Sequence, residues 1–547
     1  MKSLLKLPWI PIHICSAFTA LGALTFGDVA SAATINAADY GAAPNDAGDA
    51  TAAIQTALNV AAPGDEVLLP AGVYRISDQL TPVNNTALRG AGIGATTILY
   101  TGAVKHPIIA LTKTKSIEFE QLTLDGGGPA GMAAGGIRAE NCSGLYVHDL
   151  AIQNIGSAGG NGIELAHDVT DSRFENCAFS NIGVSNHWAS AFRISWRSSR
   201  NTIIGNRIAN TGRGGILCND GCNDLIIQRN VITGSGSEHL GIELWGGVSC
   251  DRAIVEDNMV DHWLSISGSN YAAVRRNTIT AADGVIAAIG IECVATHDSI
   301  FTDNVFGGGA SNGISLSAGP EEYDFFAYNN ISNATDWGIQ VQGDGGGANR
   351  LYFYKDSYQS TQRGPKAPLD TGYGFRIHGN THFLTLDSVT IANNPSWAIQ
   401  GIGVGSNVNA LSVVNCIITN NRSAFSWAGH MADLQWENNT VSGNTNNSAP
   451  ESTGFADQPP TAVIDGPATI VAGQPVNLTS ASTDPDGKIA HTLWDLNSGA
   501  PVAAPTAACT YAKPGHYRVS LLVWDDAGRA AHAEKTIAVL ESGGAAP

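Results

Sequence analysis

A recurring pattern of apolar and polar residues runs from about residue 137 to residue 430. Each copy contains Gly-Ile-x-Leu or a close variant, as in Gly162-Ile163-Glu164-Leu165 and Gly241-Ile242-Glu243-Leu244. The copies recur at uneven intervals of 22 to 36 residues. An uneven repeat of this length is typical of a coiled solenoid, in which each coil packs only against its two neighbours.

The second half of each copy consists of Asn followed by alternating apolar residues, as in Asn206-Arg207-Ile208 and Asn230-Val231-Ile232. Alternation with period two, in segments too short for helices, predicts two or three strands per coil and hence a parallel β-helix. Leucine-rich repeats would need a Leu pattern that is missing, and propeller blades would need four strands each. We expect the Asn side chains to stack and satisfy one another and the turn backbone.

The open ends of such a stack need covers, and residues 49–60 supply the first. This stretch is Ala-rich, with Ile54 and Leu58 four residues apart and Asp46 or Asp49 available as a cap. It predicts one amphipathic helix that closes the N-terminal end. Residues 66–74 then begin the first coils.

Three segments carry a resemblance to a known family: Asp39-Tyr40-Gly41-Ala42, residues 49–58, and Leu69-Pro70-Ala71-Gly72-Val73-Tyr74. Together they resemble the N-terminal part of the pectate-lyase-like β-helix superfamily, and the later coils match its generic repeats. The resemblance covers residues 34–445. It implies a right-handed, single-stranded parallel β-helix and a carbohydrate substrate, and it leaves the reaction open among lyases, glycoside hydrolases and uronan epimerases.

Residues 446–458 lack an apolar period and are rich in Asn, Ser, Pro and Gly, which predicts a linker. Residues 459–541 resemble a polycystic-kidney-disease (PKD) type module, in motifs such as Trp494-Asp495 and Val523-Trp524-Asp525. The usual Gly-Asp-Gly after Trp-Asp is replaced by Asn497-Ser498-Gly499. The resemblance implies an immunoglobulin-like β-sandwich that serves for spacing or substrate targeting, followed by a short tail at residues 542–547.

Residues 1–33 have the features of a signal peptide. Lys2 and Lys6 precede an apolar stretch, and small residues end it near Ala32 or Ala33. No later segment has eighteen consecutive apolar residues, so we expect no membrane span. The mature protein is predicted to be secreted, to the extracellular space or the periplasm.

Net charge narrows the range of partners. The formal charge is -19 and the chain has no basic run, which argues against binding of nucleic acid. It also disfavours a polyanionic substrate, although local Arg residues leave that open. The sequence does not indicate whether the molecule self-associates.

Eight cysteines remain after the leader, and an oxidising compartment permits disulfides. We expect either a Cys222–Cys250 bridge or simple burial. Cys218 and Cys222 resemble a metal-binding pair only superficially, because no second such pair or His cluster accompanies them. No metal site is therefore predicted.

Alternation along a strand places the candidate chemistry outside the coil. If Ile163 and Leu165 face inward, Glu164 faces outward, and the same register applies to every coil. This predicts an outward ladder, which comprises Arg138, Glu164, Arg193, Leu217, Glu243, Ser265, Glu292, Ser315, Gln340, Arg376, Gln400 and Ser426. A second outward row lies two residues on and includes Ser195, Asn219, Trp245, Ser267, Ser317 and His378. Coils stack about 4.8 Å apart, so these side chains should line a lateral groove.

Glycoside hydrolysis needs one protonated carboxyl group and one ionised carboxylate. Glu243 and Glu292 are predicted to lie two coils apart, or roughly 9–10 Å at the backbone, near the upper end of the range for inverting enzymes. We assign Glu243 as general acid, Glu292 or Asp261 as base, and Trp245 as a platform for a sugar ring. The other predicted substrate-binding residues are Arg193, Arg213, Asn219, Asp220, His262, Ser267, Gln340, Arg376 and His378.

Two other classes of function stay open. A lyase or epimerase would abstract the proton next to a uronate carboxylate, with Arg193, Arg213 or His262 available, and would neutralise that carboxylate with Arg or with Ca²⁺. The glycoside hydrolase predicted above would require no cofactor, whereas a lyase could use Ca²⁺. A glycan-binding scaffold without catalysis would keep the groove and lack a close acid and base.

Overall fold

The computed structural model describes residues 32–128, 131–156, 160–236, 240–280, 289–307, 312–317, 319–332, 334, 336–359, 372–402 and 407–541. The predicted signal peptide, apart from its last two residues, and the predicted tail lie outside this part of the chain. Among the described residues, no helix combines the length and the apolar character that a membrane crossing requires.

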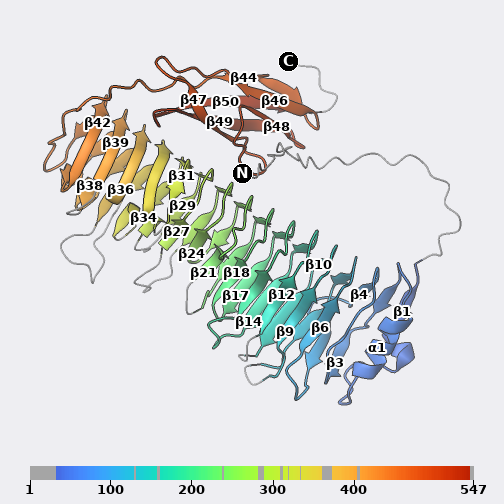
Figure 1. Ribbon diagram of the computed structural model, residues 1–547. Helices are drawn as coiled ribbons and strands as arrows, with labels where there is room; N and C mark the ends of the chain where they lie inside the picture. Colours follow the sequence, from blue (N-terminus) through green and yellow to red (C-terminus); the bar gives the residue numbers. More distant parts are fainter. Residues whose placement is uncertain are drawn as a thin grey trace, which may run out of the picture.

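The chain winds into a parallel β-helix whose coils contribute strands to three stacks (Figure 1). The first stack consists of β6 (Pro107–Thr112), β9 (Gly135–Glu140), β12 (Asn161–His167), β15 (Ser190–Ser195), β18 (Gly214–Asn219), β21 (Leu240–Trp245), β24 (Trp263–Ser267), β27 (Ile289–Val294), β30 (Asn312–Leu316), the first parts of β34 (Trp337–Tyr354) and β36 (Tyr373–Asp387), β38 (Trp397–Ile402) and β41 (Ser423–Trp427).

The second stack continues in the same sheet. It consists of β1 (Thr34–Asn36), β2 (Glu66–Leu68), β4 (Ala87–Arg89), β7 (Glu118–Glu120), β10 (Tyr146–His148), β13 (Arg173–Glu175), β16 (Thr202–Ile204), β19 (Ile226–Gln228), β22 (Ile254–Glu256), β25 (Ala273–Arg275), β28 (Ile300–Thr302), β31 (Glu321–Glu322), β32 (Phe325–Ala327), the ends of β34 and β36, β39 (Asn407–Val414) and β42 (His430–Glu437).

The third stack is a separate sheet of 15 strands. It consists of β3 (Gly72–Ile76), β5 (Thr96–Tyr100), β8 (Thr123–Asp125), β11 (Ala151–Ile155), β14 (Ala178–Ile182), β17 (Arg207–Thr211), β20 (Val231–Thr233), β23 (Met259–Val260), β26 (Thr278–Thr280), β29 (Val305–Gly307), β33 (Asn330–Ser332), β35 (Ser357–Gln359), β37 (Thr390–Ala392), β40 (Ile417–Thr419) and β43 (Thr440–Ser442).

The register of the first stack follows from burial of its apolar positions. Ile163, Ile242 and Ile291 are fully buried inside the coil. The residue after each of them belongs to a row on the outside of the coil, and we call this side of the β-helix the ladder face. Residues of this row pair from strand to strand, from Arg138 to Ser426, without a shift in register at any ladder position. The predicted all-β, right-handed parallel β-helix is confirmed.

The N-terminal end is covered by η1 (Ala37–Tyr40) and α1 (Thr51–Val60). Ile54 and Leu58 of α1 are buried against the first coils, as the amphipathic pattern predicts. The helix begins two residues later than expected, with Ala50 at the N-cap position. Asp49 nevertheless accepts hydrogen bonds from the backbone N–H of Thr51 at 2.9 Å and from its hydroxyl group at 2.5 Å.

The predicted Asn column runs through the turns between the second and third stacks. The side-chain amide of each Asn donates to the side-chain oxygen of the next at 3.0–3.2 Å and also to a backbone carbonyl; the members are Asn206, Asn230, Asn258, Asn277, Asn304 and Asn329. The next position is Asp356, which accepts from Asn329 and from the hydroxyl group of Tyr358. Burial raises the pKa of Asp356 to about 7.

We expect Asp356→Asn to stabilise the protein at neutral pH. The pKa of Asp356 is higher in the folded state than in the unfolded chain. Its contribution to the stability of the fold is therefore fully present below the unfolded-state pKa near 4 and is lost as the pH rises through about 7. An amide stays neutral and continues the column, so the variant should lose less stability between pH 5 and pH 8 than the wild type does. Over this pH range the wild type should lose at most about 3 kcal/mol of stability through Asp356, at ~1.4 kcal/mol per pH unit between pH 5 and about 7.

Thermal unfolding measured across this pH range tests the expectation. The exposed Asp465→Asn is the matched control and should leave the profile unchanged. A profile of Asp356→Asn that parallels the wild type would show that the carboxyl group of Asp356 does not titrate in this range.

Residues after the coils form a two-sheet sandwich at the C-terminus. One sheet contains β44 (Ile464–Asp465), β46 (Pro475–Ser480) and β48 (Thr506–Thr510), and the other contains β45 (Thr469–Val471), β47 (Ile489–Asp495), β49 (Gly515–Asp525) and β50 (Ala530–Leu540). The segment predicted as a linker contains no strand. It hydrogen-bonds to the last coils, since Ser452 and Thr453 accept from the backbone of β42.

The sandwich lies along the C-terminal half of the coils (Figure 1) and packs on the outer face of the second stack. A buried apolar cluster joins the two parts: Ala273, Ile300, Phe325, Ala327 and Tyr352 from the coils, and Leu493, Leu522 and Trp524 from the sandwich. At its edge Arg275, which is 0% exposed, donates to Glu256 at 2.6 Å and to Asp495 at 2.8 Å. The contact therefore excludes water from both apolar and charged groups.

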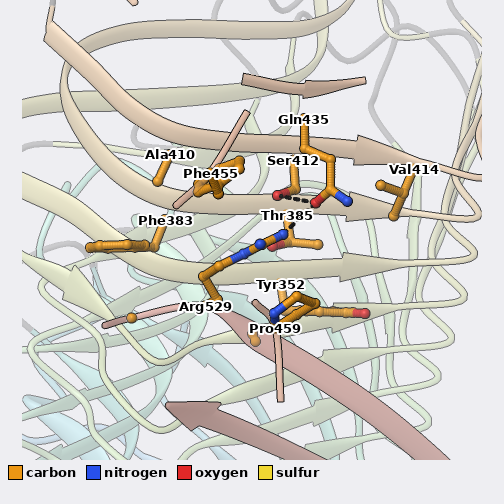
Figure 2. A pocket seen from close by; sticks show the side chains of 12 residues that line it. Tyr352, Phe383, Thr385, Ala410, Ser412, Val414, Gln435, Phe455, Pro459 and Arg529 are labelled. Atoms are coloured by element: carbon orange, nitrogen blue, oxygen red, sulfur yellow. Dashed lines mark hydrogen bonds between the residues drawn. The ribbon is translucent and has the colours of Figure 1, made fainter. Parts of the chain in front are cut away.

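A small cavity of about 120 Å³ lies where the sandwich meets the last coils. Figure 2 shows Arg529 reaching into it from the sandwich; its guanidinium donates to Gln435 at 2.5 Å and stacks on Phe455 at 4.2 Å. The cavity is lined mainly by apolar and hydroxyl side chains and contains no pair of carboxyl groups. It belongs to the contact between the two parts of the chain, and the candidate chemistry lies elsewhere.

Candidate functional site

The ladder face brings together two carboxyl groups in the middle of the β-helix. Glu243 of β21 pairs with Ser265 of β24, and Ser265 pairs with Glu292 of β27. The two carboxylic acids therefore lie two coils apart on one wall, or roughly 9–10 Å at the backbone. Both side chains are partly buried, although the ladder faces outward.

Glu243 is held by an arginine. The guanidinium of Arg213, in the loop before β18, donates to both carboxylate oxygens of Glu243 at 3.2 and 3.3 Å. Only 13% of the Glu243 side chain and 15% of that of Arg213 is exposed, so solvent screens this pair weakly. Arg193 lies on the ladder two coils before Glu243, and burial and the charge of Arg213 lower its pKa, against the opposing effect of Glu243.

Glu292 is in a different environment. It accepts hydrogen bonds from the hydroxyl groups of Ser265 at 2.8 Å and Ser317 at 3.3 Å. Burial raises the pKa of Glu292, and the negative charge of Glu243 raises it further, while the two serine hydroxyls and Trp263 act in the opposite direction. The two carboxyl groups thus have opposite surroundings, since one faces a guanidinium and the other lies in a desolvated position with only neutral donors.

Asp261, the other predicted base, supports a turn. Its two carboxylate oxygens accept hydrogen bonds from the backbone N–H of Ser235 at 2.9 Å and from the Ser235 hydroxyl at 2.8 Å. Asp261 is 9% exposed, and the neighbouring His262 is 3% exposed. These contacts hold both carboxylate oxygens of Asp261 in a turn, whereas Glu243 and Glu292 share the ladder face.

The second outward row places three predicted residues beside this pair. Trp245 ends β21, is 55% exposed, and pairs with Asn219 of β18. Asn219 donates to Asp220 at 2.6 Å and accepts from Ser195 at 3.0 Å. Ser267 pairs with Val294 on the other side. Trp245 is the member of this group whose side chain is most open to a ligand.

The remaining predicted residues form a separate group further along the ladder. Gln340 lies two coils beyond Glu292 and hydrogen-bonds to His378 at 3.2 Å, and Arg376 lies one coil further, over the ring of Trp337 at 4.8 Å. The structure does not bring these three to the acidic pair.

The structure also identifies participants that the sequence did not single out. Ser265 was predicted on the ladder and Ser317 in the second outward row, but nothing in the pattern showed that they bond to Glu292. Trp188 stacks on the guanidinium of Arg213 at 5.2 Å. It lies in a loop without a repeat position, so periodicity carried no signal for it.

Of the two expectations for Cys222 and Cys250, a disulfide bridge or simple burial, the structure shows simple burial. Both residues are buried free thiols that hydrogen-bond to one another, which raises the pKa of Cys222 and lowers that of Cys250. They remain close enough to interact because their turns stack on successive coils. Within the described ranges, no group of three or more His, Cys, Asp or Glu side chains could hold a metal ion.

Family models cover most of the chain in separate segments. Residues 34–113 match the model described as rhamnogalacturonase A/epimerase, pectate lyase-like; residues 108–260 and 193–357 match the right-handed β-helix region; and residues 457–539 match the PKD domain. The fold and these matches define the class: an all-β, right-handed parallel β-helix protein with a C-terminal PKD domain. Its N-terminal coils match the pectate-lyase-like model over residues 34–113.

Two curated relatives match short stretches. The chain is 36% identical over 86 residues to a microbial collagenase of Vibrio alginolyticus, which is 16% of this chain and 11% of the collagenase. It is 35% identical over 81 residues to collagenase ColQ1 of Bacillus cereus (strain Q1), which is 15% of this chain and 8% of that protein. The chain therefore spans about a tenth of the length of these relatives.

Similar solved structures include the A-module of the Azotobacter vinelandii mannuronan C-5 epimerase AlgE6, at 16% identity over 76% of this chain and 100% of that one, with a TM-score of 0.39. The catalytic unit of a GH87 α-1,3-glucanase from Streptomyces thermodiastaticus is 14% identical over 77% and 71% (TM-score 0.38). PfbA, a surface adhesin of Streptococcus pneumoniae, is 11% identical over 74% and 91% (TM-score 0.38).

Proposed function

We propose that the protein is a polysaccharide-degrading glycoside hydrolase that acts on the ladder face. The observation that carries this proposal is the contrast between Glu243, bonded by Arg213, and Glu292, which is desolvated. An enzyme that cleaves a glycosidic bond needs one ionised and one protonated carboxyl group, and surroundings that separate their proton affinities assign the two roles.

These surroundings favour the reverse of the roles expected from the sequence. Glu292, whose pKa is raised by burial, is the general acid that protonates the leaving-group oxygen. Glu243, as a carboxylate that accepts two hydrogen bonds from a guanidinium, is the base that activates water. A separation of two coils leaves room for that water and favours inversion at the anomeric carbon.

A second candidate is elimination or epimerisation of a uronan. Two observations favour it: the charges of Glu243 and Arg213 both act on Arg193, and the N-terminal coils match a family model that includes epimerases. Two arginines at one site are suited to neutralise a substrate carboxylate. The same face would then serve a different reaction.

One experiment separates these functions. The purified full-length chain is incubated with a panel of neutral glucans and uronans, and the products are analysed. New reducing ends without ultraviolet absorbance support hydrolysis, and NMR of the first product then reports the anomer, which we expect to be inverted. Absorbance of an unsaturated uronate indicates a lyase, a changed uronate composition without cleavage indicates an epimerase, and binding without products indicates a scaffold.

A further inference from the structure

Three tryptophan side chains are exposed on the described surface, and all three lie within two coils of Glu243. Trp188 is 56% exposed, Trp196 is 45% exposed and Trp245 is 55% exposed. A single exposed apolar residue is ordinary on a soluble protein, but large rings gathered in one region indicate a binding surface. Trp245 was a predicted sugar platform, whereas Trp188 and Trp196 have no assigned role.

Trp196 and Trp245 lie along the same edge of the ladder face. Trp245 pairs with Asn219, Asn219 pairs with Ser195, and Trp196 follows Ser195 directly. The two rings therefore project from the C-terminal ends of strands two coils apart, or roughly 10 Å along the helix axis. A chain of sugar rings that runs parallel to this axis would meet both of them.

The ring of Trp196 is held in a fixed orientation. It stacks on His167, the last residue of β12, with the ring centres 4.2 Å apart and the planes 12° from parallel. Its backbone is in the left-handed region, at φ 44°, which is uncommon for a bulky residue and costs roughly 1–2 kcal/mol. The fold maintains this conformation through backbone hydrogen bonds on both sides, from Trp196 N–H to Asn219 and from Asp168 N–H to Trp196.

Trp188 lies at the opposite, N-terminal end of the same strands and contacts the site directly. Its ring packs on the guanidinium of Arg213, which in turn bonds to Glu243. Trp188 therefore influences Glu243 only through Arg213. Trp196 and Trp245, on the C-terminal edge, do not contact Arg213 in this way, so their exposed faces can bind a ligand.

We propose that Trp196, stacked on His167, is a second sugar-binding platform, and that with Trp245 it binds a glycan chain laid along the coil axis, from Glu243 towards the N-terminal coils. The faces of pyranose rings carry C–H groups that pack on indoles, and a pre-oriented ring loses little entropy on binding. The inference rests on the proposed function for its substrate class. Beyond that function, it assigns the direction in which the glycan lies and makes Trp196 a residue that favours long substrates.

Affinity electrophoresis of the full-length protein in gels containing each polysaccharide of the panel tests this inference. Trp196→Ala should weaken retardation by the polysaccharide that retards the wild type, with a dissociation constant raised roughly tenfold, and Trp245→Ala should act similarly. Tyr40→Ala, which removes another exposed aromatic ring far from the ladder face, is the matched control and should migrate as the wild type. Circular dichroism confirms that each variant is folded.

The outcomes are distinct for the two proposals. If the panel yields products, Trp196→Ala should raise KM for long chains and leave kcat and the KM for short oligosaccharides unchanged. Products from the wild type together with unaltered binding and KM in Trp196→Ala would overturn the second platform and leave the proposed function in place. A wild-type protein that is retarded by no polysaccharide would overturn both.

Discussion

Glu243→Gln is expected to reduce turnover of the substrate by a factor of about 10² to 10⁴, the contribution that general acid–base catalysis usually makes. The amide cannot take a proton from water, although it can still accept a hydrogen bond from Arg213. Glu292→Gln should cause a loss of the same order because the acid that assists the leaving group is removed. Initial rates of reducing-end release, measured at saturating substrate, test both variants.

Glu164→Gln is the matched control for these two variants. Glu164 lies on the same ladder, three coils before Glu243, and pairs with Arg138 at 2.7 Å. Its loss should leave turnover within about twofold of the wild type, because exposed ion pairs contribute little. Rates of Glu243→Gln close to that of Glu164→Gln would reject the catalytic assignment.

The pH profile gives an independent check on the roles. Activity requires the protonated form of Glu292, so the rate should fall as the pH rises through the pKa of Glu292. Because burial raises that pKa, the alkaline limb should lie at higher pH than for an ordinary glutamic acid. This limb should disappear from the residual activity of Glu292→Gln.

Arg275→Ala is expected to destabilise the protein by about 3–5 kcal/mol, the usual cost of removing one partner of a buried ion pair. The substitution leaves the carboxylates of Glu256 and Asp495, which are 6% and 4% exposed, without their shared cation. Since Asp495 belongs to the PKD domain, the docking of that domain should weaken together with the coils beneath it. Denaturant unfolding followed by tryptophan fluorescence measures the loss.

Arg252→Ala provides the comparison. Arg252 bonds to Asp224 at 2.6 Å, so the bond is as short as that from Arg275 to Glu256, but 46% of its side chain is exposed. Its removal should cost no more than about 1 kcal/mol. Equal effects of the two substitutions would show that the PKD domain is not fixed to the coils through Arg275.

The register of the ladder could be predicted from the sequence because strand geometry leaves one choice. Once Ile163, Ile242 and Ile291 are inside, the residue after each must be outside, and stacking of coils aligns those residues. The spacing of Glu243 and Glu292 followed from that alternation alone. Their roles did not, because they depend on Arg213 and on burial by neighbouring side chains.

Contacts made by turns and by the docked domain could not be predicted. Asp261 follows a strand and looked available, but its bond to Ser235 depends on how two turns stack. Arg275, Phe325 and Tyr352 contact the PKD domain, and no feature of the sequence pattern distinguishes them from other strand residues. The residues that bury them belong to the PKD domain and lie about 200 positions further along the chain. A repeat pattern carries no information on contacts between such distant residues.

The Asn column has a consequence for how this molecule can change over evolutionary time. Successive members are separated by 19 to 28 residues, yet the bonds between them keep nearly the same length. From Asn206 to Asn304, differences in coil length therefore do not disturb the stacking of the column. Loops that border the acidic pair can be lengthened, shortened or exchanged between coils, so that new specificities can arise without redesign of the scaffold.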